Sequence, residues 1–152
     1  CNFTLMTEEK ARRLVDAGVD NINCSLWAGS PEAYAATHPN KTEATFRRME
    51  EMFFVFDRIK SERGTRLPTL RIYNVISTRN WNDFDNMLEF AHRVRADAVD
   101  FTPTDIVPGK TDCLMLGPDE RRALSAKMDG LDAQMARLGR QYGHRVEFMN
   151  RG

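Results

Sequence analysis

The sequence predicts an α/β fold in which parallel strands alternate with helices. Three observations predict it. Residues 20–26 alternate polar and apolar, with Ile22, Cys24 and Leu26 on one face, as in a half-buried strand. A helix with Pro31 at its first position follows this strand. The strand–helix unit then recurs along the chain, and such repeats form parallel sheets with right-handed crossovers.

Helices are predicted where a capping residue precedes apolar residues at helical spacing. The predicted helices start at Thr7, Ser30, Thr42, Asn82 and Pro118. The first three end near residues 18, 37 and 63. The last is expected to be a single long helix, in which Gly130 costs about 1 kcal/mol relative to Ala.

Further strands are predicted at residues 69–76, 98–102 and 146–149, and residues 1–4 are typical of a strand end. Which face of 69–76 is buried stays open, because Arg71, Tyr73 and Val75 alternate with a mostly apolar set. Polar–apolar alternation at 20–26 and 98–102 favours a barrel wall over a doubly wound sheet, whose strands are apolar on both faces.

The predicted architecture is therefore one domain over residues 1–152, a partial (β/α) TIM-type barrel segment with parallel strands and outer helices. In such a wall the polar strand faces point inward. Ser25 and Thr102 are then expected to face a common interior. The polar face of Asn21, Asn23 and Ser25 has two interpretations, a hydrated interior face or a shelf for a polar ligand.

Composition excludes several function classes. The 152 residues carry 22 Lys and Arg against 22 Asp and Glu, so no electrostatic argument favours nucleic acid or an anionic membrane. No apolar run of about 18 residues suggests a membrane span. Three widely spaced cysteines and three isolated histidines form no zinc-like motif. We expect a cytoplasmic setting. Because the chain begins at Cys1 and stops just after a strand-like piece, we also expect a segment of a longer protein.

Two local motifs have competing explanations. Residues 108–111 (PGKT) match the end of a phosphate loop, but Thr104 stands where the pattern needs glycine, and no helix is expected to follow at once. An ordinary ordered loop is favoured. Cys24 lies on the apolar strand face, which favours an inert buried thiol, whereas Cys113 lies in a predicted loop.

Five stretches taken in order resemble the barrel of radical S-adenosylmethionine enzymes. Residues 2–9 (NFTLMTEE) resemble the end of that family's third strand, and residues 20–27 (DNINCSLW) resemble its fourth. The resemblance continues through residues 30–32, 71–76 and 99–103. It is similar in particular to the subgroup that carries a further cysteine-rich cluster domain after the barrel.

The resemblance implies S-adenosylmethionine as a cofactor, bound across the open end of the barrel. By matching positions, Ser25 is expected near the methionine or ribose part, and Asn74 is expected to contact the ribose. The backbone around Thr102 and Pro103 is expected near the adenine. Lys41 is a candidate for the methionine carboxylate.

The chain also departs from the family. The Cys-x-x-x-Cys-x-x-Cys loop that holds the [4Fe–4S] cluster is absent, and so is the Gly-Gly-Glu segment of the second strand. The family's glycine after Asn2 is Phe3, and Trp27–Ala28 replaces Asp-Gly. Without three thiolates the family's cluster cannot be held, so the cluster belongs to the complete parent and this chain alone is expected to be inactive. Its expected partner is the missing N-terminal half-barrel or a second copy.

Two other functions stay open. A non-catalytic half-barrel could act as an interaction module that hides its sheet edges and the surface around residues 53–56 in an oligomer. An unrelated (β/α)-barrel enzyme could use Asp100, Asp105 and Lys110 for acid–base chemistry. The substrate and the reaction subtype stay unassigned, because one fold supports many chemistries.

Overall fold

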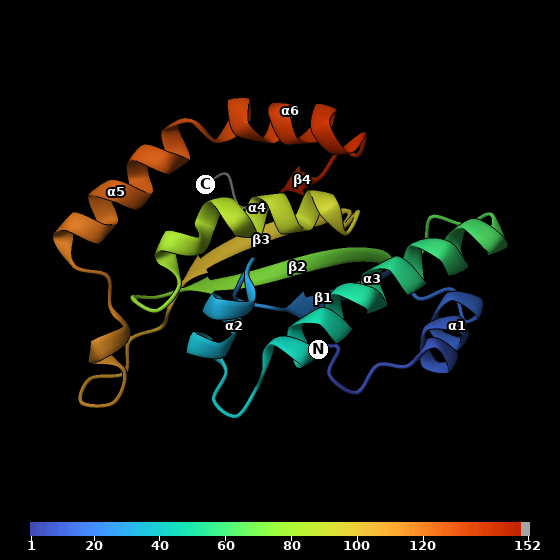
Figure 1. Cartoon of the computed structure of the whole chain (residues 1–152), viewed down its shortest axis with the longest axis horizontal. Coiled ribbons are helices and arrows are strands. Elements are labelled where there is room, and N and C mark those ends of the chain that lie inside the picture. Colours follow the sequence, from blue (N-terminus) through green and yellow to red (C-terminus); the bar gives the residue numbers. More distant parts are fainter. Residues whose placement is uncertain (150–152) are drawn as a thin grey trace.

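A four-stranded parallel sheet lies at the centre of the computed structural model, which describes residues 1–149 (Figure 1). The strands are β1 (Asn21–Ser25), β2 (Thr69–Ile76), β3 (Ala98–Pro103) and β4 (Glu147–Phe148). Their order in the sheet equals their order in the chain, and each neighbouring pair is parallel. The predicted α/β class is confirmed, and a strand lies at each of the predicted ranges 20–26, 69–76, 98–102 and 146–149, whereas residues 1–4 form no strand.

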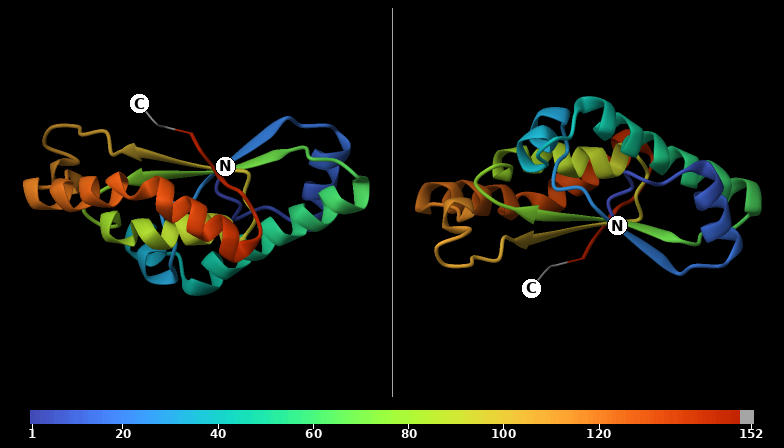
Figure 2. Two further views of the ribbon diagram at one scale, coloured as in Figure 1. Left: turned by 90° about the horizontal axis from the view of Figure 1, so that it is seen from above. Right: turned by 90° about the horizontal axis from the view of Figure 1, so that it is seen from below.

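Helices connect the strands. They are α1 (Glu8–Asp16), α2 (Pro31–Thr37), α3 (Glu43–Arg63), α4 (Phe84–Arg93), α5 (Pro118–Asp129) and α6 (Leu131–Tyr142), with short 3₁₀ turns at Trp81–Asp83 and Asp112–Leu114. The two views of Figure 2 place the helices on one side of the sheet and leave its other face bare. None of the helices described has the length and apolar character needed to cross a lipid bilayer.

The burial of β2 settles which of its faces is covered. Its buried residues are Leu70, Ile72, Asn74 and Ile76, and they face the helices together with Cys24 of β1 and Val99 of β3. The register pairs Ser25 with Tyr73, and Val75 with Thr102. Ser25 and Thr102 therefore share the bare face, as the alternation predicted.

We call this bare side of the sheet the open face. Its residues are Asn21, Asn23 and Ser25 of β1, Thr69, Arg71, Tyr73 and Val75 of β2, Ala98, Asp100 and Thr102 of β3, and Glu147 of β4. Most carry polar or charged side chains. The opposite face forms an apolar core with the helices.

Aromatic residues of α3 fill the centre of that core. Phe53 and Phe56 are both fully buried, and their rings lie 5.0 Å and 5.6 Å from the ring of Phe3. The interaction-module hypothesis invoked a surface around residues 53–56, but these two side chains belong to the core. Phe54 alone in this stretch is exposed, at 43%.

The C-terminal third differs from its prediction in two respects. The expected single helix from Pro118 is two helices that meet at Gly130, whose N–H bonds to the carbonyl of Lys127. Glycine's poor helix propensity permits this break, and α6 can then pack on α4. The last strand is shorter than the predicted 146–149, because the described pairing with β3 covers two residue pairs.

Candidate functional site

The carboxyl ends of β1, β2 and β3 lie at one edge of the sheet, where α/β proteins usually place ligands. A buried amide joins two of these ends. Asn80 is fully buried, and its Nδ2 donates to the carbonyls of Trp27 (2.9 Å) and Val75 (2.8 Å). Its Oδ1 accepts from the N–H of Ser77 at 2.8 Å. Asn80 thus holds the turn after β1 against the end of β2.

A buried carboxylate fixes the next part of the same turn. Asp83 accepts hydrogen bonds from the N–H groups of Gly29 (2.6 Å) and Ser30 (3.1 Å) and from the hydroxyl of Ser30 (2.8 Å). Asn86 donates to it as well, at 2.7 Å. A Cβ at Gly29 would lie 2.1 Å from the backbone of Asn86 and Met87. Only glycine fits where the loop approaches α4 so closely.

The open face carries a carboxylate that has no donor. Asp100 is 8% exposed, and its Oδ1 is buried without a hydrogen-bond partner among residues 1–149. Tyr73 stands directly opposite it on β2. Arg71 lies on the same face, paired with Ala98, and no ion pair joins it to Asp100 in the described structure. Buried charges are normally paired, so Asp100 is an exception.

Of the residues predicted to bind S-adenosylmethionine, Ser25 and Thr102 lie on the open face near the carboxyl edge, both half-buried. Ser25 also receives a backbone contact, because its N–H donates to the carbonyl of Cys1 at 2.7 Å. The amino group of Cys1 donates to the carbonyl of Asn23 at 2.7 Å. These two bonds are those of a parallel pairing on the outer side of β1.

Asn74 is not brought together with Ser25. Its side chain lies on the helix-covered face, in register with Phe101, and is fully buried. Neither amide atom has a hydrogen-bond partner in the part of the chain described. The reason is the strict alternation of a β-strand, which places neighbouring residues on opposite faces. The amide therefore faces the core in this structure.

Lys41 lies in the exposed turn between α2 and α3, and its N–H donates to the carbonyl of His38 at 3.1 Å. The ring of His38 lies 5.5 Å from that of Trp27 and 4.3 Å from that of Tyr34. Burial lowers the pKa of His38, with a smaller lowering from the charge of Lys41. Trp27 adopts a φ of 61°, and its buried Nε1 has no acceptor within residues 1–149. Lys41, the residue predicted to bind the methionine carboxylate, thus lies beside the aromatic rings of Trp27, Tyr34 and His38 at the end of β1.

Pro103 lines an apolar cavity of about 440 Å³ at the carboxyl edge. The walls come from the end of β2, the loop after β3 and α5, with Ile76, Leu116 and Leu124 among the lining residues. No residue of α5 is fully buried, but Leu124 and Met128 pack partly buried against the core.

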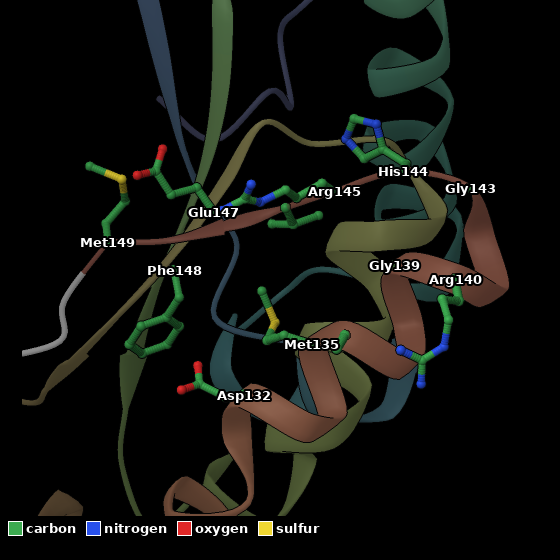
Figure 3. A pocket seen from close by; sticks show the side chains of 12 residues that line it. Asp132, Met135, Gly139, Arg140, Gly143, His144, Arg145, Glu147, Phe148 and Met149 are labelled. Carbon is green, nitrogen blue, oxygen red and sulfur yellow. The ribbon is translucent and has the colours of Figure 1, made fainter.

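A larger cavity, of about 900 Å³, lies between α6 and β4 (Figure 3). Figure 3 shows Phe148 on the side of β4 that faces α6, and Glu147 and Met149 on the other side. None of the residues predicted to bind S-adenosylmethionine lines this cavity. It lies at the outer edge of the sheet, away from the carboxyl ends of β1 and β2.

The phosphate-loop candidate folds on itself. Thr111 Oγ1 accepts from the N–H of Val107 at 2.7 Å, and Asp112 accepts from the N–H of Gly109 at 2.5 Å. A side-chain carboxylate therefore already occupies the N–H of Gly109. Residues 108–111 form a turn that leads into the 3₁₀ turn at Asp112–Leu114, so they lie in an ordered loop, as the sequence favoured.

The described residues contain no group of three or more potential metal ligands. Cys24 is buried, and burial raises the pKa of its thiol to about 12, as its apolar strand face suggested. Cys1 and Cys113 are exposed. Asp100 is buried in β3, whereas Asp105 and Lys110 are exposed in the following loop.

Comparison with known proteins shows the fold. The crystal structure of SuiB from Streptococcus suis contains a similar arrangement. It superposes with a TM-score of 0.65 over 97% of this chain, at 13% sequence identity. The chain spans 31% of SuiB. No family model matches the sequence, and no curated protein matches it either. At this identity the likeness establishes the fold alone.

Sequence reasoning missed the groups that build the carboxyl edge. Asn80, Asp83 and the indole of Trp27 were not singled out. The first two follow a strand at short spacing, a position typical of site-forming loops, and this pattern could have indicated them. No sequence pattern indicated the unpaired indole N–H of Trp27.

Proposed function

We propose that this chain is part of a radical S-adenosylmethionine enzyme, the carboxyl-side portion of its partial (β/α) TIM-type barrel. One observation carries the proposal. All four strands are parallel, the helices lie on one face, and the other face carries polar side chains that include Ser25 and Thr102. A barrel wall has this distribution, with the open face as its interior.

Two features suit S-adenosylmethionine. The apolar cavity beside Pro103 and Ile76 lies at the carboxyl edge on the helix-covered side of the strands, and it offers walls for a planar adenine that reaches over this edge. The hydroxyls of Ser25 and Thr102 lie on the open face at the same edge, where the polar part of the cofactor could accept or donate hydrogen bonds. Because its amide faces the core, Asn74 receives no contact in this proposal.

The residues present do not fit an iron–sulfur cluster. Such a cluster needs cysteine thiolates, and Cys1, Cys24 and Cys113 form no ligand group in the described structure. In the proposed complete enzyme the cluster would supply the electron that cleaves the sulfonium and forms a 5′-deoxyadenosyl radical. The role left to this chain is to bind and orient the cofactor.

Calorimetric titration with S-adenosylmethionine tests the proposal. We expect saturable binding that Ser25→Ala weakens about threefold to tenfold, the value of one lost hydrogen bond. Asn21→Ala is the matched control, because Asn21 lies on the same strand and face at the other end. It should leave the affinity unchanged.

Two results would contradict the proposal. One is a heat of mixing no larger than that of S-adenosylmethionine into buffer, with the chain folded by circular dichroism. The other is equal weakening by Ser25→Ala and Asn21→Ala, since that would mean the cofactor does not approach the carboxyl edge.

A further inference from the structure

The open face contains a second polar feature that the proposed cofactor contacts do not use. Asp100 lies in the middle of β3, is 8% exposed, and has a buried Oδ1 without a donor among the described residues. Oδ1 is covered by protein atoms without gaining a donor, which is costly for a carboxylate. The other oxygen, Oδ2, is not among the buried unpaired atoms, and it is the oxygen that a ligand on the open face can reach.

The neighbours of Asp100 define what kind of group fits. Tyr73 is its direct partner across the β2–β3 pair, so the two side chains stand side by side on the open face. A carboxylate beside an aromatic ring attracts cations through both the ion pair and the ring quadrupole. Glu147, paired with Ala98 on the same face, adds a second negative charge nearby.

Arg71 is the internal cation that could compete for this carboxylate. It lies on the open face two residues before Tyr73 and pairs with Ala98 rather than with Asp100. The ion pairs of the described residues do not include one between Arg71 and Asp100. The carboxylate is thus free to accept from an external group.

We infer that Asp100 and Tyr73 form a subsite for a cationic group of the substrate, a primary ammonium or a guanidinium. Asp100 accepts hydrogen bonds from the cation, and the ring of Tyr73 covers its apolar stem. The inference rests on the proposed function, in which the open face is the chamber where the substrate lies. It makes Asp100 a specificity residue rather than a catalytic one.

Titration of the full chain with n-butylammonium and n-butylguanidinium, followed by two-dimensional ¹H–¹⁵N NMR, tests this subsite. We expect saturable shifts at the amides of Tyr73, Asp100 and Thr102. The neutral analogue n-butanol should cause none. Asp100→Asn should weaken cation binding at least tenfold, and Tyr73→Leu about twofold to fivefold. Asp105→Asn, which changes an exposed carboxylate, should have no effect.

Several outcomes would overturn the inference. They are no saturable shifts, equal shifts with butanol, or an effect of Asp105→Asn as large as that of Asp100→Asn. Non-additive losses of stability in Arg71→Gln, Asp100→Asn and the double variant, with cation binding unchanged, would make Arg71 the true partner.

Different measurements test the proposed function and this inference, so one can be refuted without the other. Asp100→Asn should bind S-adenosylmethionine as the wild type does. If its affinity for S-adenosylmethionine falls instead, Asp100 belongs to the cofactor site and the substrate subsite is refuted. If cations bind at Asp100 while S-adenosylmethionine does not bind at all, the proposed function is refuted and the subsite stands.

Discussion

Single residues at this sheet show how strict alternation limits what a strand can present. In β2 successive residues point to opposite faces, so Tyr73 lies on the open face and its neighbour Asn74 lies in the core. A polar residue in the core must find partners or destabilise the fold. Asn74, the predicted ribose contact, lies on the helix-covered face, whereas Ser25 and Thr102 lie on the open face.

Replacing Asn74 tests this placement directly. We expect Asn74→Leu to raise the free energy of unfolding by about 1–2 kcal/mol, because it removes two unpaired buried amide atoms at nearly constant volume. Urea unfolding with an unchanged m-value measures it. Asn23→Leu is the control, since Asn23 is exposed on the open face, and should change stability by less than about 0.5 kcal/mol.

A loss of stability in Asn74→Leu would contradict this account. It would mean that the amide bonds to an ordered water in the folded protein. Asn74 would then be a structural residue with a buried partner.

At the scale of elements, α4 contains a buried histidine whose pKa is lowered. His92 is 1% exposed, and its Nδ1–H donates to the carbonyl of Leu88 at 2.8 Å. Burial lowers the pKa of His92, and the charge of His144 lowers it further. The unfolded chain binds this proton more readily than the folded one, so acid favours unfolding.

The lowered pKa of His92 predicts how the free energy of unfolding depends on pH. Stability from His92 is complete above the unfolded pKa of about 6.5 and falls as the pH drops from there towards the lower folded value. Thermal unfolding between pH 7.5 and 5 measures it. His92→Asn, which keeps a donor for Leu88, should show a smaller loss. His38→Asn should remove a further part, since burial lowers the pKa of His38 too.

An equal loss in the wild type and in His92→Asn would show that His92 does not titrate across this range. Retained helix signal with lost tertiary signal would show that the acid transition affects packing between elements. Either result would separate α4 from the pH response.

At the scale of the whole molecule, the open face distinguishes this chain from a closed α/β domain. Tyr73 and Val75 are half-buried on this face, and Figure 2 shows the helices on the other side of the sheet. Parallel sheets normally have both faces covered. This face therefore favours association, with another part of a barrel or with a second copy.

Light scattering after gel filtration tests association. We expect the wild-type chain to form an oligomer larger than a monomer. Val75→Lys, which places a charge on the open face, should shift it to a monomer. Val107→Lys is the control, because Val107 is 47% exposed in the loop after β3. A monodisperse wild-type monomer, or dissociation by Val107→Lys, would contradict the role of the open face.

The sequence by itself determined most of the elements. Features that act within a few residues were predictable. They are the helix caps at Thr7 and Ser30, the helix end at Gly64 and the polar–apolar alternation in 20–26. The parallel order of the strands followed from the alternation of elements. The shared face of Ser25 and Thr102 followed from the two-residue periodicity of side chains along a β-strand.

Only the tertiary structure decided the rest. Which face of β2 is buried, and with it the position of Asn74, depends on which side the helices pack. The break at Gly130 depends on α6 packing against α4. The contacts of Asn80 and Asp83 and the unpaired Asp100 join groups far apart in the chain. Such pairings depend on distances across the sheet, which no local pattern contains.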